Sequence, residues 1–155
     1  MEMREINTLK LFVAIMLSVM IVACSKRQGV NKTTTVNQYE AINSQAVAML
    51  NQNPDSAIVI VDSLEATGLY PECVLNMSRG TIYARMGSLR FAEFYLRKAV
   101  CEELHQIWPR GYYNGLYNLS TSIMMKGNLE EALKLSKAGY EEVTKETDPS
   151  LKVWG

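Results

Sequence analysis

The chain has 155 residues, of which 48% are hydrophobic, and its 16 acidic side chains balance 16 basic ones. This length predicts one small domain. Because lysine and arginine are scattered rather than clustered, the sequence argues against a nucleic-acid partner and against attraction to an anionic membrane by charge alone.

Residues 1–23 have the pattern of a secretory signal peptide. Two basic residues precede an apolar run from Leu11 to Ala23, which is too short to span a bilayer comfortably but suits a signal-peptide core. The run ends in Ile21-Val22-Ala23-Cys24, which resembles the lipobox of bacterial lipoproteins. This resemblance implies that Cys24 becomes the lipidated first residue of the mature chain and anchors it in a membrane. The alternatives are an ordinary cleaved signal with an incidental cysteine and a non-cleaved anchor.

Residues 24–37 are mostly polar, with three consecutive threonines, and predict a flexible tether that holds the folded domain off the membrane. No acidic residue directly follows Cys24, so nothing in the sequence indicates export to the cell surface. The expected location is therefore the bacterial cell envelope, lipid-anchored and facing the periplasm.

Residues 38–155 carry apolar side chains at helical spacing and predict an all-α domain. Asn53-Pro54 and Asp148-Pro149 have the composition of helix starts, and Trp108-Pro109 separates two helices. The expected helices cover residues 38–51, 54–66, 71–86, 88–106, 110–126 and 129–146, with a short further helix over residues 150–154.

The β-branched run Ile58–Val61 would by itself predict a strand. Two features favour a helix instead. Pro54 suits the first helical position, and Ala57 precedes Ala92 by 35 residues, which is the length of one helical repeat. We therefore predict that this run is helical.

Two stretches that begin forty residues apart, 80–92 and 120–132, share one pattern. A small residue is followed by a bulky apolar residue, then by a glycine, then by an alanine. This spacing predicts two antiparallel helices joined by a tight turn, with the glycine in a left-handed conformation just past the first helix. The small residues mark the expected close approach of the two helices, with Gly80 against Ala92 and Ser120 against Ala132.

This pattern resembles the tetratricopeptide repeat (TPR). That family's packing residues correspond here to Gly80, Tyr83, Gly87, Ala92 and Ala99, and in the second unit to Ser120, Ile123, Gly127, Ala132 and Gly139. Gly139 departs from the family's alanine, and the period is longer than the usual ~34 residues, with the extra residues in the link 105–111.

The resemblance implies a helical-repeat solenoid of about three antiparallel helix pairs. The units cover residues 38–67, 71–106 and 110–147, and residues 149–155 start a further helix. Repeat arrays normally end in a capping helix with a polar face, so we expect a fragment of a longer array. The alternative is a short terminal stub.

In the TPR family, the first helix of each repeat lines a concave groove. The resemblance assigns this groove to seven residues: Met77, Thr81, Arg85, Asn114, Tyr117, Thr121 and Met124. Their mixed polarity suits an extended peptide or a helix. The lysine–asparagine clamp of chaperone-binding members is absent, so a ligand with a free carboxyl terminus is not expected.

The expected function is that of a membrane-anchored periplasmic scaffold that binds a protein or peptide. The helix start at residues 53–57 and the lipobox also resemble the sensory parts of large Gram-negative sensor kinases. This resemblance implies that the scaffold could be a truncated sensory domain that acts in signal transduction. The alternative is a glycan-uptake accessory lipoprotein of the outer membrane. An enzyme is the third and weakest class, because glycine-rich phosphate loops, HExxH and GxSxG motifs do not occur.

Three further residues carry chemistry of interest. His105, the one histidine, is expected to be a solvated residue near a helix end. Antiparallel packing brings Cys73 and Cys101 to the same end of a helix pair, so they either form a disulfide or are two buried free thiols. We expect no metal, because only a distant histidine was available to join the cysteines, and no cofactor.

Overall fold

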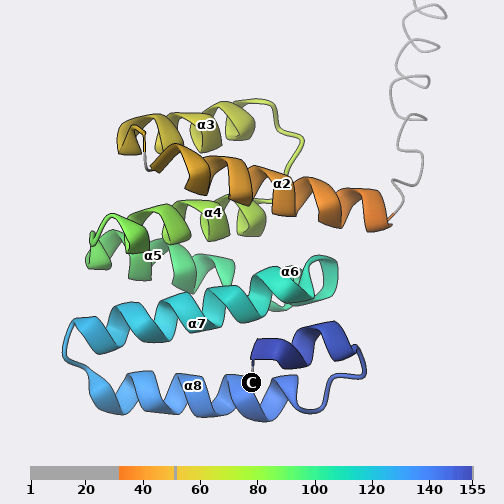
Figure 1. Cartoon of the computed structure of the whole chain (residues 1–155), viewed down its shortest axis with the longest axis vertical. Helices are drawn as coiled ribbons and strands as arrows, with labels where there is room; N and C mark the ends of the chain where they lie inside the picture. Colours follow the sequence, from red (N-terminus) through yellow and green to blue (C-terminus); the bar gives the residue numbers. More distant parts are fainter. Residues whose placement is uncertain (1–31, 51, 155) are drawn as a thin grey trace, which may run out of the picture. The chain divides into compact units, whose positions relative to one another are not determined.

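The computed structural model describes residues 32–50 and 52–154 (Figure 1). These residues form seven α-helices and one 3₁₀ helix, and no strand occurs in the described ranges. The helices are α2 (Lys32–Leu50), α3 (Pro54–Ala66), α4 (Glu72–Arg85), α5 (Leu89–Ala99), α6 (Glu102–Ile107), α7 (Pro109–Met125) and α8 (Leu129–Val143), followed by η1 (Pro149–Trp154). The predicted all-α class is confirmed for this part of the chain, and Ile58–Val61 is helical.

The predicted signal peptide, the lipobox and residues 24–31 of the predicted tether lie outside the described residues. Residues 35–155 form one compact unit. Among the described helices, none combines enough length with enough apolar character to cross a bilayer.

Side-chain caps explain where two of the helices start. The side-chain oxygen Oδ1 of Asn53 accepts hydrogen bonds from the backbone N–H groups of Asp55 and Ser56, at 3.1 and 3.4 Å. At the start of α8, Asn128 accepts from the Glu131 backbone N–H at 3.3 Å and donates to the Glu131 carboxylate at 2.8 Å. Such caps satisfy backbone donors that the first helical turn leaves free, so the β-branched run in α3 follows a well-defined helix start.

Gly87 and Gly127 adopt the left-handed conformation that was predicted for them, and Gly68 adopts it as well. Gly68, Gly87 and Gly127 have φ angles of 64°, 71° and 92°. A side chain at these positions would strain the backbone, which is why glycine ends α3, α4 and α7. The tight turns at Gly87 and Gly127 fold α4 against α5 and α7 against α8 (Figure 1).

The contact opposite Gly80 differs from the one predicted. A Cβ atom on Gly80 would lie 2.5 Å from Leu96 Cγ and 3.1 Å from the Leu96 backbone nitrogen. The close approach of α4 and α5 is therefore between Gly80 and Leu96, one helical turn beyond Ala92. Ala92 is itself fully buried in the same core.

The prediction of one continuous helix over residues 88–106 is wrong, because the structure has two helices there, α5 and α6. Val100 and Cys101 leave helical geometry, with ψ angles of 85° and 165°, and so separate α5 from α6. Val100 lies close to α7, where a Cβ on Gly115 would be 3.0 Å from its Cγ2. The bend turns α6 back, so that Leu104 and Trp108 become fully buried.

The two ends of the described chain also depart from the prediction. Helix α2 starts at Lys32, so residues 32–37, predicted as tether, are helical. Val36 packs against the core cluster that contains Tyr39, which explains why the helix extends this far. At the other end, the predicted seventh helix is the 3₁₀ helix η1, and its Leu151 is buried against Tyr113 and Val143.

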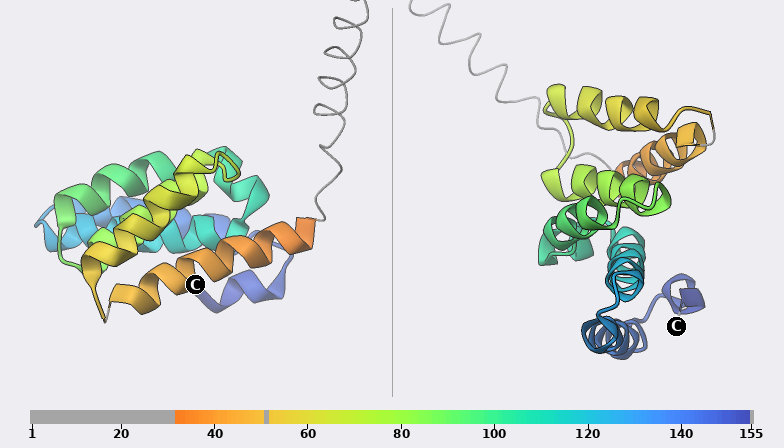
Figure 2. Two further views of the ribbon diagram at one scale, coloured as in Figure 1. Left: turned by 90° about the horizontal axis from the view of Figure 1, so that it is seen from above. Right: turned by 90° about the vertical axis from the view of Figure 1, so that its left-hand side faces the viewer.

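The core lies between helices that follow one another along the chain. α3 packs on α4, α4 on α5, and α5 on α7, while α6, α8 and η1 also contact α7 (Figures 1 and 2). One cluster of buried residues joins Ala46 of α2 and Val61 of α3 to Ile82 of α4. A larger cluster surrounds Trp108 and includes Leu96. Five hydrophobic residues of α2 and α3 are buried: Tyr39, Ile42, Ala46, Ala57 and Val61.

Candidate functional site

Two of the seven groove residues predicted from the TPR resemblance lie in the core. Met77 is 1% exposed and Thr81 is 5% exposed. The Thr81 hydroxyl accepts a hydrogen bond from the Asn118 side-chain amide of α7 at 3.3 Å. Because α7 packs across this face of α4, neither residue is accessible to a ligand, and the groove assignment fails for both.

The other five predicted groove residues are at least partly accessible. Arg85, Tyr117 and Met124 are exposed, whereas Asn114 and Thr121 are half-buried. Among these five, Tyr117 alone lines the pocket that lies between α7 and α8. Tyr117 is 64% exposed, so it is available to a ligand and is not a core residue.

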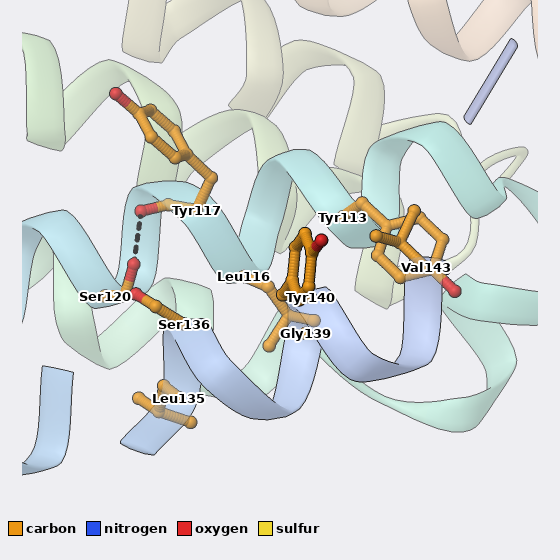
Figure 3. Close-up of a pocket in the computed structure, with 9 residues that line it drawn as sticks. All are labelled: Tyr113, Leu116, Tyr117, Ser120, Leu135, Ser136, Gly139, Tyr140 and Val143. Atoms are coloured by element: carbon orange, nitrogen blue, oxygen red, sulfur yellow. Dashed lines mark hydrogen bonds between the residues drawn. The ribbon is translucent and has the colours of Figure 1, made fainter. Parts of the chain in front are cut away.

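This pocket, which we call the α7–α8 pocket, has a volume of about 350 Å³. It lies between the two helices of the last hairpin (Figure 3). Nine residues line it: Tyr113, Leu116, Tyr117 and Ser120 from α7, and Leu135, Ser136, Gly139, Tyr140 and Val143 from α8. Aliphatic and aromatic side chains form most of the wall, and two serines contribute hydroxyl groups. This composition is typical of sites that take an apolar group and orient it with a few polar contacts.

Gly139 lets α8 approach Leu116 of α7 closely at the wall of the pocket. A Cβ atom at this position would lie 3.3 Å from Leu116 Cδ1, which is closer than usual van der Waals contact, so the end of the Leu116 side chain would have to shift. This is the position at which the chain departs from the alanine of the TPR pattern. The departure was visible in the sequence, but nothing in it indicated a pocket.

Exposed apolar side chains continue from the pocket along α8. Tyr140 is 57% exposed, and Leu133 and Leu129 are 70% and 65% exposed. Leu129 and Leu133 are four residues apart and Tyr140 follows seven later, so all three lie on one face of the helix. An apolar stripe of this kind on a charged helix indicates an interaction surface.

Tyr113, which lines the pocket, also belongs to a polar network. The Tyr113 hydroxyl donates to Glu146 Oε1 at 2.8 Å, and His105 Nε2 lies 3.0 Å from the same oxygen. His105 also stacks on the ring of Tyr112, with the ring centroids 4.5 Å apart. The Tyr112 hydroxyl in turn donates to Glu142 at 3.2 Å. His105 is therefore half-buried and held by α7 and by the segment after α8, in contrast to the solvated residue that was predicted.

Burial and the nearby carboxylates determine the charges in this network. Burial, followed by the Glu142 carboxylate, raises the pKa of Tyr112 to about 12. Burial and the hydrogen bond to Glu146 raise the pKa of Tyr113 well above its usual range. Hydrogen bonds from Tyr113 and His105 lower the pKa of Glu146. At neutral pH both tyrosines are thus neutral donors, and the network joins α7 to the end of α8 and to the segment after it.

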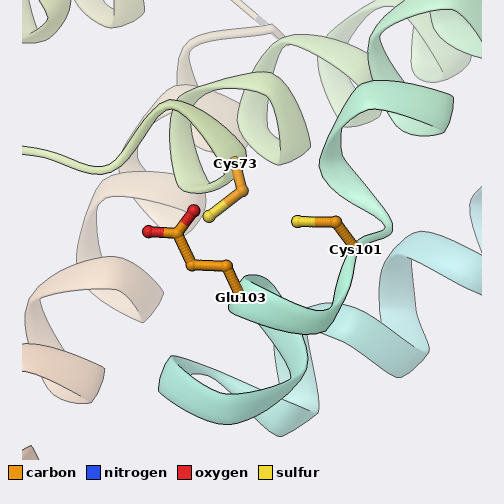
Figure 4. A group of neighbouring side chains, drawn as sticks. All are labelled: Cys73, Cys101 and Glu103. Carbon is orange, nitrogen blue, oxygen red and sulfur yellow. The ribbon is translucent and has the colours of Figure 1, made fainter.

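The two described cysteines are neighbours, as the antiparallel packing predicted. Cys73 lies in the first turn of α4 and Cys101 between α5 and α6, and both are free thiols. Their sulfur atoms and a carboxylate oxygen of Glu103 all lie within 4.8 Å of one another (Figure 4). Burial, then Glu103, raises the pKa of Cys73 to about 12. The disulfide stays a prediction, and Glu103 is a third potential ligand that we had not anticipated, two residues beyond Cys101.

Comparisons with known proteins do not assign the chain to a group. No family model matches it, and neither a curated protein nor a solved structure shows a significant match.

Proposed function

We propose that the chain is a TPR-like scaffold that binds an amphipathic helix of a partner protein at the α7–α8 pocket. The single observation that supports this most strongly is the pocket itself, about 350 Å³ in volume and flanked by the exposed rings of Tyr117 and Tyr140. In this proposal, lipidation at Cys24 holds the scaffold in the bacterial cell envelope, facing the periplasm.

The repeat character is supported by the local equivalence of two hairpins. The α4–α5 and α7–α8 pairs turn at Gly87 and Gly127, which occupy equivalent positions of the repeated pattern. A third pair, α2 and α3, precedes them, and α3 packs on α4. We infer that the three pairs form a short helical-repeat solenoid, as in TPR proteins, in which each pair buries its apolar face against its neighbours.

The dimensions and chemistry of the α7–α8 pocket favour a peptide ligand. A volume at the lower end of the range for small-molecule sites accommodates one or two bulky apolar side chains. The stripe of Leu129, Leu133 and Tyr140 extends this surface along α8, so a partner helix lying beside α8 would bury its own apolar face there. Aromatic anchors such as Tyr117 and Tyr140 commonly carry most of the binding energy in such interfaces.

A peptide selection followed by calorimetric titration tests this function. Helical peptides are selected from a displayed library against the folded chain, and the strongest binder is titrated against variants. We expect Tyr117→Ala to weaken binding by about 1–2 kcal/mol, because truncation removes an aromatic anchor. Circular dichroism should show an unchanged helix content, because the Tyr117 side chain is mostly exposed.

Phe94→Ala is the matched control for this titration. Phe94 is an aromatic residue of similar exposure, 52%, but it lies on α5 and does not line the pocket. Its truncation should leave the affinity unchanged. Two results would show that the pocket is not the binding site. One is a melting temperature of Tyr117→Ala far below that of the unaltered protein, and the other is equal affinity of Tyr117→Ala and Phe94→Ala for the peptide.

A further inference from the structure

Three side chains with the chemistry of metal ligands meet where the start of α4 approaches the junction of α5 and α6. Cys73 comes from α4, Cys101 from the junction, and Glu103 from the first turn of α6. Figure 4 shows the two sulfur atoms facing each other across a short gap, with the carboxylate of Glu103 beside them. The cluster is separate from the α7–α8 pocket, none of whose lining residues it shares.

The separations fit a small tetrahedral ion after a modest adjustment. A Zn²⁺ ion holds sulfur ligands at about 2.3 Å and carboxylate oxygens at about 2.1 Å, which places two ligand atoms of one ion roughly 3.5–3.8 Å apart. The three ligand atoms here already lie within 4.8 Å of one another. Each pair therefore needs to close by at most about 1.0–1.3 Å, which side-chain rotation of Glu103 and Cys101 supplies.

We propose that Cys73, Cys101 and Glu103 form a binding site for a thiophilic divalent cation such as Zn²⁺. Two sulfur ligands exclude Ca²⁺ and Mg²⁺, which prefer a full set of oxygen ligands. One carboxylate completes three protein ligands, and water occupies the fourth position of the tetrahedron.

Charge and access both suit a cation. The ligands become two thiolates and a carboxylate when they bind a metal, so together they carry three negative charges. A divalent ion balances most of this charge. Cys73 is buried, Cys101 is half-buried and Glu103 is exposed, so the cluster has a buried end and an open end through which an ion enters.

A titration with Co²⁺, and with Zn²⁺ in competition with a chromogenic chelator, tests the site. The full chain is used in detergent with a phosphine reductant that does not bind metals. We expect one equivalent of Co²⁺ per chain, with sulfur-to-cobalt charge-transfer absorption and the visible bands of a tetrahedral ion. Affinity should rise with pH, because metal binding displaces the thiol protons.

The third cysteine of the chain provides a matched control. In chain produced without lipidation, Cys24→Ser removes a thiol that is not one of the three proposed ligands, and it should leave binding unchanged. Cys101→Ser should weaken Zn²⁺ binding at least about a hundredfold, since losses of ten- to a hundredfold already follow from altering residues outside the ligand set. Glu103→Gln, an exposed substitution that should preserve folding, should weaken it at least about tenfold. Circular dichroism verifies that each variant is folded.

Three results would overturn the site. The first is equal Zn²⁺ affinity of the Cys24→Ser and Cys101→Ser chains. The second is the absence of sulfur-to-cobalt charge-transfer bands. The third is a Cys73–Cys101 disulfide in protein that is isolated from envelopes without reductant. In the disulfide, both sulfur atoms are bonded to each other and neither is a thiolate ligand. Peptide binding at Tyr117 is measured separately, so failure of one proposal leaves the other standing.

Discussion

At the scale of single residues, Gly80 is the position where a one-carbon change has the clearest consequence. A Cβ atom there would collide with Leu96 Cγ at 2.5 Å and approach the Leu96 backbone at 3.1 Å. Leu96 is fully buried and cannot move aside freely. We expect Gly80→Ala to lower the free energy of unfolding by about 1–3 kcal/mol, as overpacking of a core usually does. Urea denaturation measures this loss.

Gly139→Ala is the control for this substitution. Both glycines are helical, but the nearest atom to a Cβ on Gly139 is the end of the Leu116 side chain, at 3.3 Å. Since alanine favours a helix by up to about 1 kcal/mol over glycine, this variant should be neutral or stabilised. Equal urea midpoints for the two variants would contradict the close approach of α4 and α5.

Glu146 is a single residue that makes the stability of the fold depend on pH. Its pKa is lowered in the folded chain by hydrogen bonds from the Tyr113 hydroxyl and His105, against the opposing effects of burial and of Asp148. A lowered folded pKa contributes stability that is fully present above the unfolded glutamate value of about 4.3, and that is lost as the pH falls through the folded value. Glu146→Gln should therefore be less stable than the unaltered chain at pH 7 and lose less stability on acidification.

The free energy of unfolding is measured by urea denaturation at a series of pH values from 7 downwards. Glu141→Gln, which removes the charge of an exposed glutamate near the end of α8, is the control for a change in net charge. If Glu146→Gln has the same pH profile as this control, the hydrogen bonds to the Glu146 carboxylate do not persist in solution.

At the scale of helices, Arg79 fixes α3 on α4. Its guanidinium lies 2.7 Å from Asp62 Oδ1 and 2.7 Å from Glu65 Oε2, both on α3. The arginine side chain is buried, whereas both carboxylates are largely exposed. The cation is thus the group that needs a partner, and either carboxylate alone satisfies part of that need.

A double-mutant cycle tests this asymmetry. Asp62→Ala and Glu65→Ala should each cost little, because the other carboxylate still pairs with Arg79. The double variant leaves a buried guanidinium without a charged partner, so its loss should exceed the sum of the single losses by about 1–2 kcal/mol. Strictly additive losses in urea denaturation would show that the two carboxylates act independently and that Arg79 does not depend on them.

The interruption between α5 and α6 also depends on a contact between helices. The sequence through Val100 and Cys101 continues the helical pattern of its neighbours, so local preference predicted one helix. The bend depends on the contact of Val100 with α7 beside Gly115, which no local pattern encodes. Antiparallel packing brings Cys101 close to Cys73, as predicted. Glu103 follows the bend and lies beside both, which is why the cluster of three potential ligands was not foreseen.

At the scale of the whole molecule, helix identity and turns were predictable because they depend on local chemistry. Proline and asparagine at helix starts, and glycine at Gly87 and Gly127, act within a few residues of their own position. The accessible surface was harder to predict, because it depends on which helix covers which. Met77 and Thr81 were assigned to a groove by resemblance, yet α7 covers them, whereas Tyr117 remains accessible.

The central claim is that a partner helix binds at the α7–α8 pocket. Hydrogen–deuterium exchange of the chain with and without a selected helical peptide tests it most directly. We expect slower amide exchange in the segments that line the pocket, residues 113–120 and 135–143, and no change in α3. Protection confined to α3 and α4, or no protection at a saturating peptide concentration, would contradict the claim.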